Sequence, residues 1–266
     1  METAEIGKTN RAQVIVISLA SLTIEDVARI AVSWWPLVPA LALFVGTLST
    51  SYALIATAVV YLTVKGFYAP SKVRKPLLLI MAGLLAGISI LVNFALVPLL
   101  LFCGIMTLLL SFFSREPLPY SHQLAQAVQT GIYFGVGLLL ITGLYTWIAG
   151  PNLLEIYQTG MSIHLELDRP YVPWLFLHIW DFALFLGLPI FGLLLWSSFR
   201  WQQQRLHLIS LALVLTLLIV TLSGTGRGET GRVWIFFMPL ALVGVTAVLK
   251  DLTVYQRWLM TGCQAA

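Results

Sequence analysis

Long apolar stretches follow one another along this chain, and the short segments between them carry most of its charges. A helix needs about 20 apolar residues to cross the hydrocarbon core of a bilayer, and its backbone groups must be satisfied internally there. No alternating ten-residue pattern typical of transmembrane strands is present. The sequence therefore predicts an all-α, polytopic transmembrane bundle, and its 266 residues have room for about eight spans with short loops.

The composition agrees with a membrane location. Charged residues make up 10% of the chain and the mean hydropathy is +0.92, whereas soluble domains carry roughly a quarter charged residues. The net charge of +4 is scattered through short loops, so it does not indicate nucleic-acid binding. Two cysteines make neither a disulfide framework nor a metal site.

The whole chain, residues 1–266, reads as one transmembrane domain. Residues 1–24 form a cytoplasmic or interfacial lead-in, and residues 250–266 form a polar cytoplasmic tail. Gly83 and Gly87 lie four positions apart, which favours close packing against a neighbouring helix. Six tryptophans are interpreted mainly as anchors at the membrane interface: Trp34, Trp35, Trp147, Trp174, Trp180 and Trp234. The eight expected spans are residues 27–46, 52–64, 77–92, 96–113, 124–149, 171–196, 206–222 and 233–249.

Basic residues then predict the orientation, because loops rich in Lys and Arg stay on the cytoplasmic side. If residues 65–75 are cytoplasmic, twelve basic residues fall inside and three fall outside. Both termini are then cytoplasmic, and the protein is a multi-pass protein of the plasma (cell inner) membrane. The three exceptions are Arg169, Arg227 and Arg232.

Two of these exceptions lie in an external glycine-rich loop, residues 223–232, with the sequence Ser-Gly-Thr-Gly-Arg-Gly-Glu-Thr-Gly-Arg. Arg227 and Arg232 can each make bidentate bonds to a phosphate, and Glu229 can orient one of them. Gly226 and Gly228 let backbone N–H groups approach the anion, at the start of a helix. The alternative is a polar hairpin whose arginines extend to lipid headgroups. A dinucleotide site is rejected because no strand precedes the loop.

The second external segment, residues 150–173, carries a short amphipathic stretch expected to lie in the membrane interface. His164, Glu166 and Asp168 follow at its end and could act as general bases, or they form a solvated loop. Asp181 lies inside the next span and needs a partner, either His178 on the same helix face or an arginine of the glycine-rich loop. The candidate catalytic residues are therefore His164, Glu166, Asp168 and Asp181, and no further catalytic residue is identified.

Three stretches, residues 31–62, 82–99 and 181–189 together with 227–239, resemble polytopic GT-C class membrane glycosyltransferases. The resemblance implies transfer of a sugar from a polyprenyl-phosphate carrier on the outer face, with Arg227 and Arg232 holding the carrier phosphate. Such enzymes usually carry a catalytic acid in the first external loop, but residues 46–51 hold none. Either this chain is an enzyme that lacks its amino-terminal part, or catalysis uses other residues. We favour the first alternative, in which this chain alone is inactive.

Two other classes of function remain open. A transporter or flippase-like protein for an anionic lipid or solute would use the same arginines, with Asp181 as a coupling group inside the bilayer. A non-catalytic membrane subunit is the third reading. The expected partners are a polyprenyl-phosphate-linked sugar and membrane lipids, and not nucleic acid; no cofactor or metal is predicted, and a divalent metal has no support in the sequence.

Overall fold

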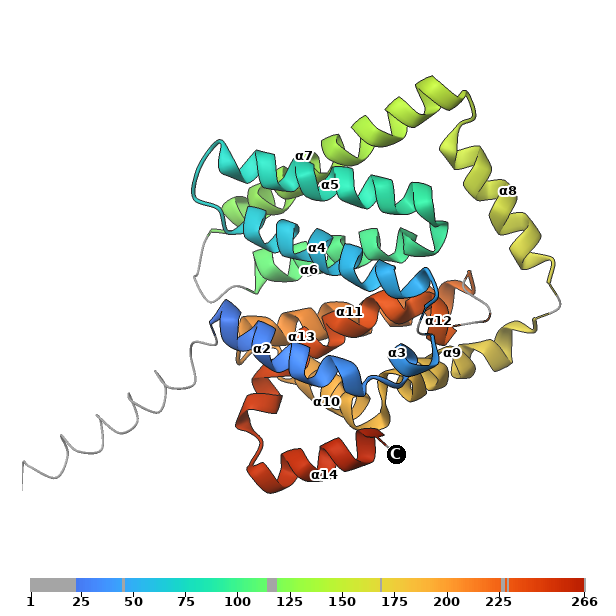
Figure 1. Ribbon diagram of the computed structural model, residues 1–266. Helices are drawn as coiled ribbons and strands as arrows, with labels where there is room; N and C mark the ends of the chain where they lie inside the picture. The colour runs from blue at the N-terminus through green and yellow to red at the C-terminus, as the bar shows by residue number, and fades with distance from the viewer. Residues whose placement is uncertain are drawn as a thin grey trace, which may run out of the picture.

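The computed structural model describes residues 23–44, 46–113, 119–167, 169–225, 228 and 230–265. Within these ranges the chain is helical and contains no strand, which confirms the all-α class (Figure 1). The elements are α2 (Ile24–Trp34), η1 (Trp35–Leu37), α3 (Pro39–Leu43), α4 (Ser49–Phe67), α5 (Arg74–Val92), η2 (Phe94–Leu96), α6 (Val97–Phe112), α7 (Tyr120–Ala149), α8 (Leu153–Leu165), α9 (Tyr171–Leu186), α10 (Leu188–Phe199), α11 (Arg205–Ser223), α12 (Thr230–Val233), η3 (Trp234–Phe237), α13 (Met238–Asp251) and α14 (Val254–Ala265).

Six helical segments of the described chain are long and apolar enough to cross a membrane, and a bent pair, α9 with α10, raises the number to seven. Helices of this number, length and apolar character are those of a multi-pass membrane protein. Two of the eight expected spans are not continuous helices, since residues 27–46 and 171–196 are both broken. Most of residues 250–266, the expected polar tail, form the helix α14.

Prolines explain the first break. Pro36 and Pro39 lack a backbone N–H, and a proline disfavours helical geometry in the residue before it. The chain accordingly makes a 3-10 turn over Trp35–Leu37, and Val38 adopts an extended conformation before α3 begins. Residues 27–46 are therefore not the single span that their apolar composition predicted.

Gly187 forms the second break, where α9 and α10 meet at a bend of 112°. Its φ of +95° is disfavoured for residues with a Cβ atom. A sharp bend removes helical partners from nearby carbonyl groups, which must then find other donors. Gln264 of α14 supplies one, because its Nε2 donates to the carbonyl oxygen of Leu186 at 2.6 Å and to that of Leu37 at 3.3 Å. One amide thus joins both helix breaks to the C-terminal helix.

Glycines bring α5 and α7 into close contact, as the spacing of Gly83 and Gly87 predicted. A Cβ atom at Gly83 would overlap the carbonyl oxygen of Phe134, and one at Gly87 would overlap the side chain of Ile141. The contact is reciprocal, since a Cβ atom at Gly137 of α7 would overlap the carbonyl oxygen of Ile80. Small residues of this kind allow membrane helices to pack backbone to backbone.

The segment Thr230–Asp251 forms the centre of the bundle, with 78% of its apolar window buried, whereas the window of α7 is 6% buried and α7 lies at the periphery. Two of the six tryptophans belong to this core, because Trp34 and Trp234 are 8% and 2% exposed. Their interpretation as interface anchors is wrong. Trp147 and Trp180 are 81% and 54% exposed, as an anchor requires.

A buried polar cluster joins the helices around this centre. Ser197 of α10 donates to the carbonyl oxygen of Gly244 in α13 at 3.1 Å and accepts from the hydroxyl of Ser210 in α11 at 2.9 Å. Its Oγ also lies 2.7 Å from Nδ1 of His207. Hydrogen bonds between helices satisfy polar groups that lipid cannot, so this cluster fixes α10, α11 and α13 against one another.

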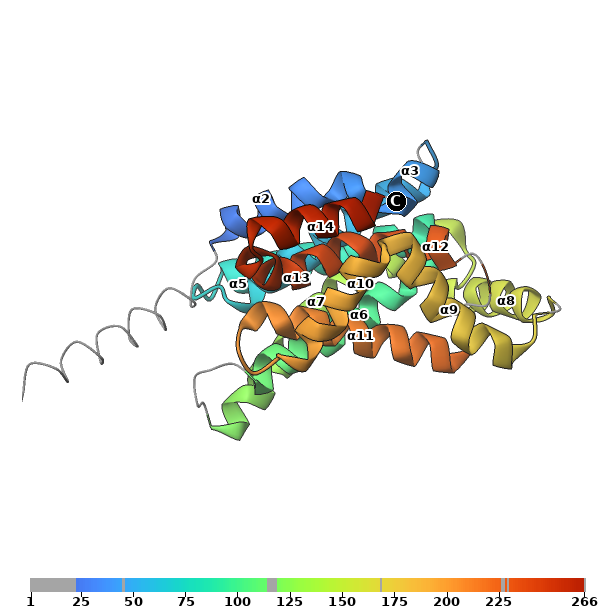
Figure 2. The same cartoon turned by 90° about the horizontal axis from the view of Figure 1, so that it is seen from below.

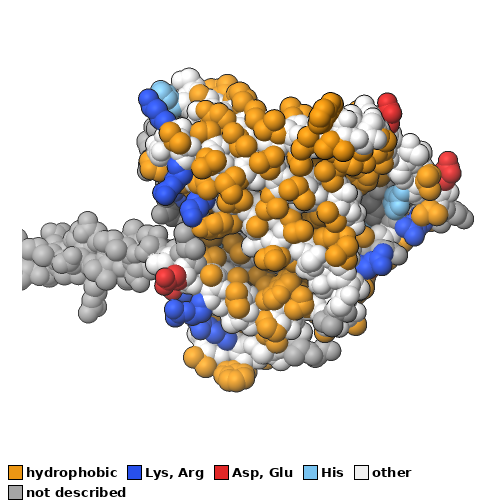
Figure 3. All heavy atoms as spheres, turned by 45° about the horizontal axis from the view of Figure 1, so that its top comes forward, with side chains coloured by type: hydrophobic (Ala, Val, Ile, Leu, Met, Phe, Trp, Pro, Cys, Tyr) orange, Lys and Arg blue, Asp and Glu red, His pale blue; other side chains and the backbone are white. Residues whose placement is uncertain are grey.

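The basic turns and the glycine-rich loop lie at opposite ends of the bundle. The turns after α4 and α10 and the end of α13 lie on the left in Figure 1, and α8 and α12 lie on the right. Figure 3 shows many of the Lys and Arg side chains of this face toward one end, together with histidine and acidic side chains, then an apolar band across the middle, and acidic, histidine and basic side chains at the other end. The basic turns are therefore separated from the glycine-rich loop by the thickness of the bundle.

Candidate phosphate-binding site at the glycine-rich loop

The glycine-rich loop begins where α11 ends. Gly224 takes the left-handed conformation that commonly ends a helix, with φ of +65°. The hydroxyls of Ser223 and Thr225 lie 2.8 Å apart, which folds the first residues of the loop back on the helix. Tyr171 donates from its hydroxyl to the carbonyl oxygen of Leu222 at 2.7 Å, so the start of α9 is tied to the base of this loop.

The far side of the loop is fixed by the packing of Gly231. A Cβ atom there would overlap the ring of Phe185 in α9, so only glycine permits this approach. Thr230 beside it is 1% exposed, and its hydroxyl has no hydrogen-bond partner within the described part of the chain. Because a buried hydroxyl without a partner is costly, this oxygen is a natural contact for a bound polar group.

A cavity of about 340 Å³ opens beside these residues. Asp181 of α9 and Arg232 of α12 both line it; Asp181 is half-buried and Arg232 is exposed. Phe44 and Phe185, whose ring centroids are 5.4 Å apart, give the cavity an apolar wall. Its lining is Phe44, Asp181, Phe185, Thr230, Gly231 and Arg232.

Of the two partners expected for Asp181, the arginine of the loop lines the same cavity and His178 does not. His178 is 1% exposed and lies between two indole rings, with its ring centroid 5.4 Å from that of Trp174 and 5.6 Å from that of Trp234. Asp181 instead shares the cavity with Arg232. A carboxylate and a guanidinium at one cavity can orient each other and a bound phosphate.

His164 and Glu166 lie at the end of α8, and the cavity lining does not include them. Glu166 is exposed, while Nε2 of His164 is buried and has no hydrogen-bond partner in the described ranges. The predicted amphipathic stretch is helical, and Tyr157 packs on Phe94 with ring centroids 5.6 Å apart. The four other predicted site residues, Gly226, Arg227, Glu229 and Asp168, lie outside the described residues.

Arg169, one of the three basic residues expected outside, lies against the glycine-rich loop, although the cavity lining does not include it. Its guanidinium packs against the backbone of Gly228, where a Cβ atom would overlap Nη1. Gly228 has a φ of +107°, so both its conformation and its close neighbour require glycine. The signal in the sequence was its place among the three basic residues expected outside.

Searches of known protein families, curated proteins and solved structures find no match for this chain. Among the described residues, no group of three or more His, Cys, Asp or Glu could hold a metal ion. The expectation of a site without metal or cofactor stays a prediction.

Proposed function

We propose that this chain is a membrane glycosyltransferase of the GT-C type, or the C-terminal part of one. In this proposal it binds a polyprenyl-phosphate-linked sugar at the glycine-rich loop. The observation that carries the proposal is the cavity where Arg232, Thr230 and Asp181 meet. It combines an exposed cation, a buried hydroxyl and a carboxylate with an aromatic wall.

Each feature of the cavity suits one part of such a substrate. Arg232 would bind the carrier phosphate and stabilise the charge that develops on it as the sugar departs. Arg227, Glu229 and the backbone of Gly226 and Gly228 would complete the phosphate contacts. Phe44 and Phe185 would contact the isoprenoid chain, because the carrier is apolar beyond its phosphate.

Asp181 is the best-placed of the four candidate catalytic groups, since it alone lines this cavity. As a carboxylate it would accept the proton of the acceptor hydroxyl while the acceptor oxygen bonds to the anomeric carbon of the sugar. The bond from that carbon to the phosphate oxygen then breaks, and the carrier phosphate leaves with its electron pair. His164 and Glu166 do not line the cavity and have no role in this proposal.

The proposed orientation places the glycine-rich loop outside and the basic turns inside a plasma (inner) membrane, with both termini cytoplasmic. It is supported by the separation of the loop from the basic turns along the bundle (Figures 1 and 3). The broken segment α2–α3 would then supply the eighth crossing.

A transporter or flippase-like protein for an anionic lipid or solute is the second candidate, and the 112° bend between α9 and α10 favours it. Broken helices at mid-membrane often carry substrate and ion sites in transporters. Asp181 lies on the bent pair and would serve as the coupling group. A non-catalytic subunit would bind the same lipid without turnover.

The test measures binding of a short-chain polyprenyl phosphate to purified protein carrying Arg232→Ala. Loss of one charge-assisted bidentate contact costs about 1.5–3 kcal/mol, which weakens binding roughly 10- to 100-fold. Arg200→Ala is the matched control, because Arg200 stacks on Trp196 at the opposite end of the bundle. Equal affinities for the two variants would contradict the proposed site.

Asp181→Asn separates the two candidate functions. In an enzyme it should leave phosphate binding intact and abolish sugar transfer by the full-length protein. Arg227→Ala and Arg232→Ala should also abolish sugar transfer, but by weakening phosphate binding. In a transporter it should instead stop movement of lipid phosphate across proteoliposomes. Transfer at the wild-type rate by Asp181→Asn would remove Asp181 from the reaction.

A further inference from the structure

A second, larger hollow lies away from the glycine-rich loop, between the two amphipathic helices α2 and α14. Both helices lie on the same flank of the bundle (Figure 2). The hollow has a volume of about 630 Å³, within the usual range for ligand sites, and shares no lining residue with the cavity at the loop. Its walls come from α2 and α14, and its floor from the end of α13.

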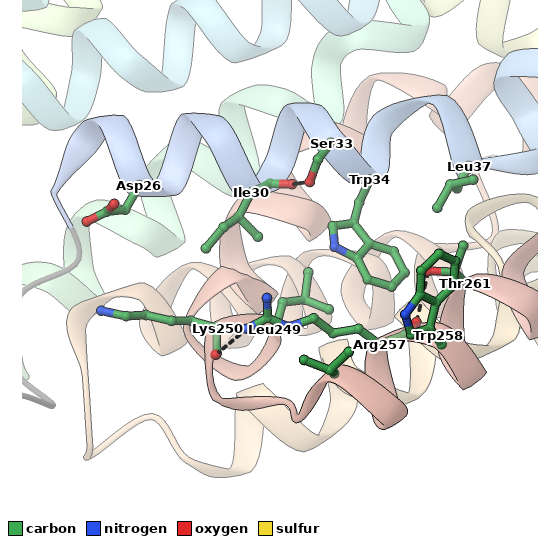
Figure 4. A pocket seen from close by; sticks show the side chains of 11 residues that line it. Asp26, Ile30, Ser33, Trp34, Leu37, Leu249, Lys250, Arg257, Trp258 and Thr261 are labelled. Atoms are coloured by element: carbon green, nitrogen blue, oxygen red, sulfur yellow. Dashed lines mark hydrogen bonds between the residues drawn. The ribbon is translucent and has the colours of Figure 1, made fainter.

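The groove has a charged end and an apolar end. Figure 4 shows Asp26 and Lys250 at one end and Leu37 and Trp258 toward the other. Arg257 reaches back toward the charged end, where its Nη2 donates to the carbonyl oxygen of Lys250 at 2.9 Å. Ile30, Trp34 and Leu249 make the apolar surface in between.

The apolar end is closed. Gln264 near the end of α14 donates to the carbonyl oxygen of Leu37, which holds α14 against the break between α2 and α3. The open side carries apolar side chains, since Val254 and Trp258 are 71% and 73% exposed. Exposed apolar groups on an amphipathic helix at a bundle flank face lipid.

The charges of the lining identify the occupant. Two cations and one carboxylate line the groove, so a purely anionic headgroup would meet the Asp26 carboxylate. A zwitterionic headgroup with a primary ammonium satisfies all three. Its phosphate would pair with Lys250 and Arg257, and its ammonium would donate to Asp26. The charged end lies at the basic end of the bundle, as a lipid of that leaflet requires.

We infer that this groove binds one phosphatidylethanolamine-type phospholipid from the leaflet on the basic side. Its headgroup lies between Asp26 and Lys250, and one acyl chain lies along Ile30, Trp34 and Leu249. The lipid then fills the space between α2 and α14 and forms part of the contact that holds the C-terminal helix. This inference does not depend on the function proposed for the loop.

The experiment is native mass spectrometry of the detergent-purified full chain, mixed with phosphatidylethanolamine, phosphatidylglycerol and phosphatidylcholine of identical acyl chains. We expect phosphatidylethanolamine to be retained several-fold more than either phosphatidylglycerol or phosphatidylcholine. Lys250→Gln should lower its retention about tenfold, while Lys72→Gln, in the exposed turn after α4, should not. The Lys250 side chain makes no hydrogen bond to the rest of the described chain, so the variant should melt like wild type.

Asp26→Asn tests the ammonium contact, because it should abolish the preference for phosphatidylethanolamine over phosphatidylcholine. A phosphatidylethanolamine with a photoreactive acyl chain should cross-link to α2 or α14. Equal retention of all three lipids, equal loss in the two lysine variants, or cross-links confined to other helices would overturn the inference. Competition by soluble glycerophosphoethanolamine at equal concentration would also overturn it, because the acyl chain would then contribute nothing.

Discussion

The contact between α5 and α7 predicts a specific cost for adding one methyl group. Gly137→Ala places a Cβ atom over the carbonyl oxygen of Ile80 and 2.9 Å from the backbone nitrogen of Leu84. Ordinary carbon–oxygen contacts are about 3.3–3.6 Å, so the two helices must separate by roughly 1 Å. Overpacking of this kind typically costs about 1–3 kcal/mol.

Gly135→Ala is the matched control on the same helix, because nothing lies within 4 Å of its added Cβ atom. Alanine is favoured over glycine in a helix interior by about 1 kcal/mol, so this variant should be unchanged or slightly stabilised. The two variants should therefore differ by about 1–3 kcal/mol. For a chain of this size, that corresponds to a difference in Tm of roughly 2–10 °C.

The thiol of Cys103 supplies the assay, since it is 4% exposed and becomes reactive only when the bundle opens. A thiol-reactive fluorophore followed during heating reports unfolding, in a Cys263→Ala background that removes the exposed cysteine. Gly137→Ala should melt below Gly135→Ala. If it melts at the same temperature or higher, the backbone contact between α5 and α7 is wrong.

Two further predictions concern hydrogen bonds. Ser197→Ala removes the centre of the buried cluster and should lower stability by about 1–3 kcal/mol in the same melting assay, whereas Ser198→Ala, whose hydroxyl returns to its own helix, should change little. The backbone and hydroxyl of Thr23 hold the pKa of Asp26 below its usual range. The ionised Asp26 carboxylate therefore stabilises the start of α2 above about pH 4, and this stabilisation is lost as the pH falls through the lowered pKa. Hydrogen exchange of the backbone amides of α2 should accelerate over that fall in pH. Asp26→Asn should remove this pH dependence.

Apolar composition was enough to predict the class of fold, because a membrane helix must satisfy its own backbone. It could not show where helices break. Residues 27–46 contain Pro36 and Pro39, and residues 171–196 contain Gly187 followed by Pro189. Both segments therefore contain residues that commonly interrupt a helix. Sequence alone does not decide whether such residues bend a span or end it, since neighbouring helices and side chains such as Gln264 supply the missing partners.

The C-terminal helix has a local signal in the sequence. Thr253 and Gln256 form a reciprocal cap, in which Gln256 accepts from the backbone of Thr253 at 2.9 Å and donates to its hydroxyl at 3.3 Å. This Thr-x-x-Gln spacing is typical of a helix start. The cap therefore predicts a helix within the segment expected as a polar tail.

The candidate site was anticipated in part. The sequence named Asp181 and an arginine of the glycine-rich loop as partners, and both line one cavity. It did not anticipate Arg169 against Gly228, or Thr230 and Phe185 in the wall. These contacts join residues more than 40 positions apart, and no periodic pattern within one segment reports such a distance.

The central claim is that the glycine-rich loop faces outward and binds a lipid phosphate. Thr225 is exposed in this loop, so Thr225→Cys in the Cys263→Ala background reports both properties. A membrane-impermeant maleimide should label it from the outside of intact cells, and a short-chain polyprenyl phosphate should slow that labelling several-fold. Lys72→Cys, in a basic turn, should label only after the membrane is opened. Two results would contradict an outward-facing site for lipid phosphate. One is that position 225, like position 72, is labelled only after the membrane is opened. The other is that the lipid phosphate does not change the rate at which position 225 is labelled.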